Sequence, residues 1–304
     1  MFDKARRSIF PILAALIWGV AFVAQKNNTA GALTFNMSRS VVAFLFLLPV
    51  IALFTKGDIR HILSENTRRD TAMLWIGGVS CGTALSVATY LQQLGLDSGT
   101  EAGKASFLTA MYIVLVPVFG LFLKKKVPFN VWISVCISVG GLYLLCVKNG
   151  FSVRPSDMLI AACSVVFAVH ILVIDHFSAR CNGIKLSCIQ FLTCAVLSGI
   201  GAFIFEEPEF SAITQNLGAV LYLGIGSSGI AYTLQIIAQK NANPTVLTIL
   251  LSMESVFGVI AGAIHLHEVL LPREYIGCAL VLCAVILAQL PLEKWIGKNR
   301  RVKS

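Results

Sequence analysis

Residues 250–268 read LLSMESVFGVIAGAIHLHE, an apolar run interrupted near its start by one carboxylic acid, Glu254. About 20 apolar residues in helical form cross the roughly 30 Å hydrocarbon core of a bilayer. The run and the residues before it predict a membrane-spanning helix over 245–266, with Glu254 close to its middle. An ionisable group at that depth is costly and usually faces the interior of the protein. Glu254 therefore predicts a buried partner or a water-filled cavity.

The whole chain has the composition of an integral membrane protein. Of its 304 residues, 57% are hydrophobic and 13% are charged, and the mean hydropathy is +0.80, whereas a soluble domain has about 25% charged residues. Apolar stretches recur along the full length, so we predict an all-α membrane protein with ten transmembrane helices. They are expected near 9–25, 33–54, 72–94, 105–123, 129–147, 158–174, 186–205, 217–237, 245–266 and 274–291.

The lysines and arginines predict how these helices are oriented. The chain has 24 of them against 15 acidic residues, a net charge of +9. With ten spans, most lie on the side of both chain ends, and the opposite side has Lys26, Lys104, Lys148, Arg154 and Arg273. By the positive-inside rule we expect both termini in the cytoplasm, and the plasma membrane, of bacterial inner-membrane type, as the location. The basic tail KWIGKNRRVKS (294–304) is expected to bind anionic lipid, and no nucleic-acid partner is expected.

The two halves of the chain repeat each other. At an offset of 142, Tyr90 and Gln93 match Tyr232 and Gln235, and three further matches are Gly82 with Gly224, Met111 with Met253, and Gly120 with Gly262. LIWGVAFVAQK (16–26) likewise matches VVFAVHILVID (165–175). Five helices in each half, in 1–148 and 149–304, predict two inverted five-helix repeats around a central cavity. Because apolar residues coincide often by chance, the tyrosine and glutamine matches carry most of this inference.

Several stretches resemble EamA-domain proteins of the drug/metabolite transporter superfamily. GLDSGTEAGKASFLTAMYIVLVPVFGLFL (95–123) resembles their fourth-helix region, and YLGIGSSGIAYTLQIIAQKNANPTVLTILLSMESVFGVIAGAIHLHEVLLPREYIGCALVLCAVILAQ (222–289) is similar to their eighth to tenth helices. The similarity extends to ALIWGVAFVAQK (15–26), Arg39, FAVHILVIDHFSAR (167–180) and Gln190. The resemblance implies a carrier that exports metabolites, amino acids or foreign compounds.

One position departs from the family pattern. The family often has Glu-Pro where this chain has Glu254-Ser255, whereas the first half keeps a proline, Pro117, a few residues beyond the matching site. We therefore expect the ninth span to have lost a kink, because proline removes a backbone hydrogen bond from a helix.

Three ionisable residues are candidates for the cavity, and each has a second interpretation. Glu254 can carry a proton during transport, or tie the ninth helix to a neighbour through hydrogen bonds. Arg39 can bind a carboxylate or phosphate of a substrate, or serve as a structural or snorkelling residue. His170 can gate or shuttle a proton, or hydrogen-bond a backbone carbonyl.

Uncharged residues complete the predicted lining. The tyrosines and glutamines within the spans either face the cavity or bridge helices, and Trp18 forms an aromatic wall or packs in the bundle. The set comprises Tyr90, Gln93, Tyr112, Gln190, Tyr232 and Gln235.

The function expected from this sequence is secondary transport of a small organic molecule, by alternating access and in the direction of export. GTEAGKAS (99–106) departs from the phosphate-binding loop, so no nucleotide, and no other cofactor or metal, is expected. The expected partners are a small-molecule substrate, membrane lipid, protons or a counter-solute, and a second copy of the chain in a homodimer. The alternative is a lipid-modifying membrane enzyme that uses Glu254, His170 and Arg39. Such enzymes usually gather several Asp, His or Arg residues near one interface, and the candidates here are single and scattered.

Overall fold

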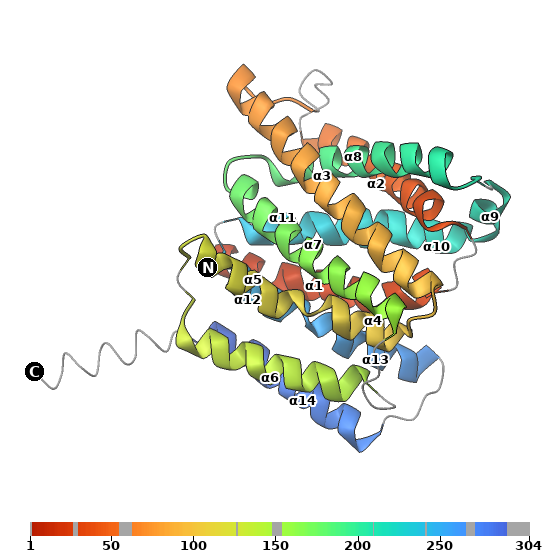
Figure 1. Cartoon of the computed structure of the whole chain (residues 1–304). Helices are drawn as coiled ribbons and strands as arrows, with labels where there is room; N and C mark the ends of the chain where they lie inside the picture. The colour runs from red at the N-terminus through yellow and green to blue at the C-terminus, as the bar shows by residue number, and fades with distance from the viewer. Residues whose placement is uncertain are drawn as a thin grey trace, which may run out of the picture.

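The computed structural model describes residues 2–26, 30–54, 63–125, 127–147, 154–208, 210–240, 242–265 and 271–290, and helices are the regular elements among them (Figure 1). The helices are α1 (Phe2–Lys26), α2 (Ala32–Phe54), α3 (Arg68–Asp97), α4 (Ala102–Thr109), α5 (Tyr112–Phe122), α6 (Phe129–Cys146), α7 (Pro155–Ser178), α8 (Gly183–Phe205), α9 (Phe210–Gln215), α10 (Leu217–Leu221), the π-helix η2 (Tyr222–Tyr232), α11 (Thr233–Gln239), α12 (Pro244–Leu251), α13 (Met253–His265) and α14 (Pro272–Gln289). The basic tail 294–304 lies outside the described residues.

Nine helical stretches within the described residues are long and apolar enough to cross a membrane. They are Ala32–Phe54, Arg68–Asp97, Lys104–Phe122, Phe129–Cys146, Pro155–Ser178, Gly183–Phe205, Leu217–Gln239, Pro244–Ala261 and Pro272–Gln289. They match nine predicted spans, from 33–54 onward, and confirm the all-α membrane fold. The first predicted span, 9–25, lies on α1, which has 25 residues; the count of ten stays a prediction.

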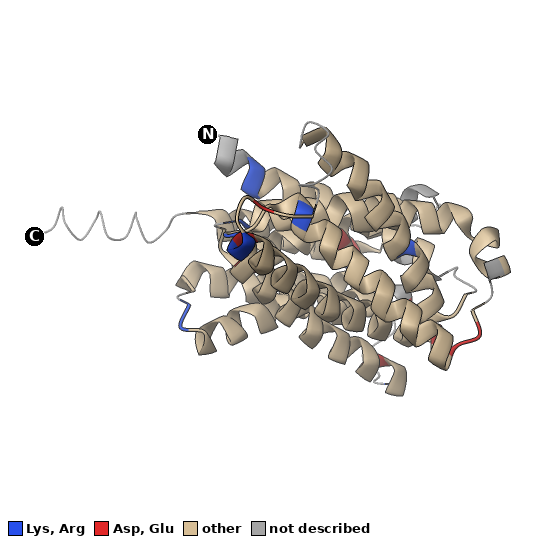
Figure 2. Ribbon diagram, turned by 90° about the horizontal axis from the view of Figure 1, so that it is seen from above, with Lys and Arg blue, Asp and Glu red and all other residues tan. Residues whose placement is uncertain are grey.

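Charged residues gather toward the ends of the helices. In Figure 2 the ribbon between the two ends is almost entirely tan, and most of the blue residues lie toward the end at which α1 begins. Charges at the middle of a bilayer are costly, so this distribution suits a protein that spans one. The face that points to the cytoplasm stays a prediction.

The last helices of the two repeats, α6 and α14, lie side by side (Figure 1). Asn130 at the start of α6 donates from Nδ2 to the carbonyl oxygens of Leu287 and Leu290 at the end of α14, 3.2 Å in each case. Arg273 at the start of α14 donates from Nε to the carbonyl oxygen of Leu144 near the end of α6, 3.1 Å away. The pair is antiparallel, which is how corresponding helices of inverted repeats run.

The second helices of the repeats, α2 and α8, form another antiparallel pair. Glu206, just beyond α8, accepts hydrogen bonds from the backbone N–H groups of Leu33 and Thr34 at 2.8 and 2.9 Å, and from the Thr34 hydroxyl at 2.8 Å. These N–H groups belong to the first turn of α2 and have no acceptor within the helix. Glu206 therefore caps α2 from the other repeat.

We expect Glu206→Ala to destabilise the protein by about 1–2 kcal/mol, the range for loss of a helix cap. Thermal unfolding of the purified protein in detergent measures this change. The matched control is Glu207→Ala, because the neighbouring Glu207 side chain is exposed. Equal unfolding temperatures for the two variants would contradict the capping role.

The fourth predicted span, α4 with α5, is held to α7 at both ends. Lys104 on α4 forms an ion pair with Asp157 at the start of α7, and Lys125 after α5 forms one with Asp175 near the end of α7. Since starts pair with starts and ends with ends, α4–α5 and α7 run parallel. One membrane-spanning helix, α6, lies between α5 and α7 in the chain, so the spans on either side of it must run in the same direction across the membrane.

Two corresponding spans are broken near their middles. Ala110 and Met111 separate α4 from α5, and Ser252 separates α12 from α13. At the repeat offset of 142, Ala110 corresponds to Ser252. The breaks therefore recur at matching positions, and both lie beside the cavity described below.

The ninth span is interrupted at Ser252 although it has no proline at position 255; the expected loss of a kink stays a prediction. The Ser252 hydroxyl donates to the carbonyl oxygen of Ile249 at 2.7 Å, and the Thr248 hydroxyl donates to that of Thr245 at 2.8 Å. Such side-chain bonds compete with the helical hydrogen bonds of the backbone. Serine and threonine hydroxyl groups therefore accompany the interruption of the helix here.

Candidate functional site

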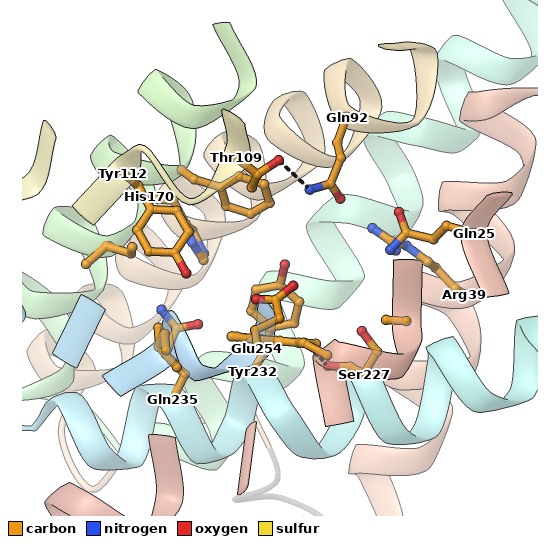
Figure 3. Close-up of a pocket in the computed structure, with 15 residues that line it drawn as sticks. Gln25, Arg39, Gln92, Thr109, Tyr112, His170, Ser227, Tyr232, Gln235 and Glu254 are labelled. Atoms are coloured by element: carbon orange, nitrogen blue, oxygen red, sulfur yellow. Dashed lines mark hydrogen bonds between the residues drawn. The ribbon is translucent and has the colours of Figure 1, made fainter. Parts of the chain in front are cut away.

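A cavity lies between the two repeats, beside both helix breaks (Figure 3). The space in it that is open to the centres of water-sized molecules is about 50 Å³. One enclosed water needs roughly 10–15 Å³ by this measure, so a small organic solute requires the cavity to widen. The lining residues are Trp18, Ala21, Gln25, Arg39, Gln92, Thr109, Tyr112, Phe167, His170, Ile171, Ser227, Tyr232, Gln235, Leu251 and Glu254.

Glu254 lies in the first turn of α13 and is half-buried. At the repeat offset it corresponds to Tyr112, the first residue of α5, so both residues that follow a helix break line the cavity. Among the described residues Glu254 has neither an ion pair nor a side-chain hydrogen bond. The structure thus gives no support to the interpretation in which this carboxyl group ties the ninth span to a neighbour.

Arg39 on α2 is 6% exposed. In Figure 3 it lies on the opposite side of Glu254 from Gln235. Its Nε donates to Oδ1 of Asn36 at 3.1 Å, and Asn36 in turn donates from Nδ2 to the Ser198 hydroxyl on α8 at 2.8 Å. These bonds fix the guanidinium to the α2–α8 pair, and within the described part of the chain no carboxylate forms an ion pair with it. Arg39 is both anchored in the bundle and open to an anionic group in the cavity.

His170 on α7 is completely buried, and its Nε2 lies 3.0 Å from Oε1 of Gln190 on α8. Its partner is therefore a side-chain amide and not the backbone carbonyl that one interpretation expected. Its other ring nitrogen, Nδ1, has no hydrogen-bond partner among the described residues, and neither has Oε1 of Gln235. Buried polar groups are normally paired, so these two atoms beside the cavity are exceptions.

Aromatic rings form one wall of the cavity. The rings of Trp18 and Tyr232 have centroids 4.7 Å apart, and the Trp18 indole donates to the carbonyl oxygen of Ser227 at 3.2 Å. Ser227 and Tyr232 belong to η2, an 11-residue π-helix. π-Helical segments are rare and often lie at functional sites.

Seven of the ten predicted site residues line this cavity: Trp18, Arg39, Tyr112, His170, Tyr232, Gln235 and Glu254. The structure places the other three elsewhere. Gln190 lies behind His170, and Gln93 on α3 donates to the carbonyl oxygen of Gln25 at 3.3 Å and to Asp97 at 2.8 Å. Tyr90, also on α3, is half-buried and is not among the lining residues.

Four polar lining residues were missed from the sequence: Gln25, Gln92, Thr109 and Ser227. Gln92 donates from Nε2 to the Thr109 hydroxyl at 3.2 Å, a bond drawn in Figure 3. Thr109 lies immediately before the helix break, so recognition of the break would have identified it. Ser227 lies in the glycine-rich stretch GIGSSG (224–229), a composition from which an irregular helix could have been predicted.

A second cavity lies one helical turn beyond the first. About 270 Å³ of it is open to the centres of water-sized molecules, and Val116, Lys125, Asp175 and Thr245 are among its lining residues. On α5, Tyr112 lines the first cavity and Val116 the second; on α7, Ile171 lines the first and Asp175 the second. Residues four apart on a helix are about one turn, or 5.4 Å, apart. A layer of apolar side chains including Val116, Leu247 and Leu251 packs between the helices here.

The sequence profile of the EamA-like transporter family matches residues 7–147 and again residues 154–290. The chain belongs to the EamA-like transporter family. A protein of Archaeoglobus fulgidus named an uncharacterized transporter is 30% identical over 282 residues, which are 91% of this chain and 84% of that protein. A solved crystal structure with 18% identity superimposes with a TM-score of 0.76, covering 98% of this chain and 99% of the other, and shows the same fold.

Membership of the EamA-like family and the transporter relative point to a multi-pass membrane transporter rather than an enzyme. Arg39, His170 and Glu254 are scattered along the sequence but line one cavity in this EamA-like protein. Their scatter in the sequence therefore does not count against an enzyme. The case against an enzyme rests on the family and on the architecture of two repeats.

Proposed function

We propose that this protein is a secondary transporter that exports a small organic molecule, such as a metabolite, an amino acid or a drug-like compound, across the plasma membrane by alternating access. The observation that carries the proposal is the cavity between the two repeats, whose carboxyl and guanidinium groups form no ion pair among the described residues. Inverted repeats commonly hold the substrate site at their interface, near the middle of the membrane. Export is the direction that the family resemblance implies, and both termini are proposed to be cytoplasmic.

The second cavity supports alternating access. It lies at the ends of α5 and α7 and at the start of α12, the helices that also line the first cavity, and an apolar layer separates the two cavities. Small movements of these helices that separate the apolar side chains of the layer would connect the two cavities on one side of the membrane. The ion pairs that hold α4–α5 to α7 favour a movement in which these helices shift together against α12.

Glu254 is proposed to couple transport to protons. It is the one carboxyl group among the described residues that line the cavity, and it has no side-chain hydrogen bond or ion pair within them. A carboxyl group in such a position can exchange a proton as the cavity opens to one side and then the other. Proton relays in membrane carriers use carboxylates of this kind.

Two measurements test the proposed function. A metabolite-release screen compares cells that overproduce the protein with cells that lack it, and solutes released in excess are then labelled and tested for flux in proteoliposomes. Movement of an unchanged solute supports the transporter. Chemical conversion of the solute would instead identify an enzyme, and absence of flux for every released solute would contradict transport.

The ion pair beside the second cavity gives a prediction of its own. Lys125 is more exposed than Asp175, with relative side-chain exposures of 35% and 15%, so the pair lies between exposed pairs, worth about 0.2–1 kcal/mol, and buried ones, whose disruption costs about 3–5 kcal/mol. We expect Asp175→Lys to lower the unfolding temperature and the flux, and the exchange Lys125→Asp with Asp175→Lys to restore most of both. Failure of the double variant to recover would show that the ion pair does not hold α5 to α7.

A further inference from the structure

One end of the cavity is lined by hydrogen-bond acceptors that lack donors. Gln235 on α11 is 2% exposed and His170 is fully buried, and neither Oε1 of Gln235 nor Nδ1 of His170 has a partner among the described residues. Figure 3 shows both side chains near Tyr112, away from Arg39. A buried acceptor left unpaired costs about 1–3 kcal/mol. Two such atoms on one cavity therefore indicate a ligand that satisfies them.

The hydrogen bond between His170 and Gln190 determines whether the unpaired Nδ1 of His170 is a donor or an acceptor. In the orientation that the structure gives the Gln190 amide, its Oε1 accepts a hydrogen bond, which assigns the ring proton of His170 to Nε2, 3.0 Å away. In a neutral imidazole the other nitrogen, Nδ1, is then an acceptor. The cavity thus offers the lone pair of Nδ1 and the carbonyl oxygen of Gln235, and both require a donor.

Glu254 adds a carboxyl group, which accepts hydrogen bonds and is negatively charged when it is deprotonated. It lies between the Gln235 end and the Arg39 end in Figure 3, and it has no donor partner among the described residues. The rings of Trp18, Tyr232 and Phe167 also line the cavity. The faces of aromatic rings attract an organic cation. Uncharged acceptors, a carboxylate and aromatic walls together describe a site for a positively charged hydrogen-bond donor.

We propose that Glu254, Gln235 and His170 form an amine subsite, which receives the protonated amino group of the transported solute. A primary ammonium group has three N–H donors, one for each of the three acceptors, and its charge matches the carboxylate. An alcohol brings one donor and no charge, and a carboxylate brings no donor and a charge of the wrong sign. The substrate class is therefore organic amines. The inference rests on the proposed transport function, since it names the chemistry of the same cavity.

The test compares three probes with one phenyl ring and similar length: phenethylamine, 2-phenylethanol and 3-phenylpropionate. Their dissociation constants are measured on the full-length protein in lipid nanodiscs by calorimetry. We expect phenethylamine to bind at least about tenfold more tightly than the other two, a factor that corresponds to 1.4 kcal/mol. Equal binding of the alcohol, or tighter binding of the carboxylate, would overturn the proposal.

Variants identify the residues responsible. Glu254→Gln and Gln235→Leu are each expected to remove most of the preference for the amine, whereas Glu101→Gln, an exposed acid outside the cavity, is expected to retain it. Gln235→Met serves as a second variant should Gln235→Leu fail to fold. A preference that survives in both the Glu254 and the Gln235 variants would overturn the subsite.

Flux separates this inference from the proposed function. Amine-selective binding without flux of any solute in proteoliposomes would contradict the transporter and leave the subsite standing. Flux of neutral or anionic solutes, with no preference for amines in binding or transport, would overturn the subsite and leave the transporter standing.

Discussion

Replacing Glu254 with glutamine is expected to abolish transport driven by a pH gradient. Glutamine keeps the size of the side chain and its place in the first turn of α13, but it cannot bind and release a proton. Because no other carboxyl group lines the cavity in the described part of the chain, no neighbouring acid can take over the exchange. We expect gradient-driven flux to fall at least about tenfold, which corresponds to 1.4 kcal/mol. Downhill exchange of the same solute is expected to fall less.

The measurement uses proteoliposomes loaded with a pH-sensitive dye and a solute taken from the release screen. Proton movement and solute movement are followed together in the wild type, in Glu254→Gln and in Glu101→Gln, the exposed control. Unfolding temperatures of all three proteins show whether the cavity variant is folded. Wild-type transport that does not respond to the pH gradient would remove the coupling role of Glu254, whatever the variant does.

The fold was predictable because the bilayer dictates its main features. Helices satisfy every backbone hydrogen bond in a membrane. Apolar stretches of span length therefore predicted nine spans that are found among the described residues. The matches of Tyr90 and Gln93 with Tyr232 and Gln235 indicated two repeats. The broken ninth span was not predicted, because the inference used proline and overlooked Thr248 and Ser252, whose hydroxyl groups bond to the backbone.

The lining of the cavity was less predictable, because the two repeats correspond only approximately. Gln93 and Gln235 match in sequence, yet Gln235 lines the cavity and Gln93 bonds to the backbone of Gln25. Its neighbour Gln92 faces the cavity instead, and adjacent residues on a helix point about 100° apart. A repeat identifies residue types at matching positions. The face that each helix presents depends on packing and on local departures such as η2, which the sequence pattern does not specify.

Gly258→Leu is expected to have the largest effect on stability. A Cβ atom at Gly258 would lie 3.0 Å from the carbonyl oxygen of Gly19, and one at Gly19 would lie 2.8 Å from the backbone nitrogen of Gly258. The two backbones touch, and backbone atoms cannot move aside as a flexible side chain can. Close glycine contacts of this kind hold membrane helices together.

Leucine at position 258 would force α13 away from α1. The shift would also separate Glu254, which lies one turn before Gly258, from Trp18, which precedes Gly19. Overpacking typically costs about 1–3 kcal/mol and occasionally more, and we expect the upper part of that range because both contacts are with backbone. Unfolding temperature and flux are both expected to fall. The matched control is Gly140→Leu on α6, where an added Cβ would meet nothing within 4 Å. If the two variants unfold at the same temperature, the α1–α13 contact does not position the cavity, and the wall formed by Trp18 and Glu254 must be held by other helices.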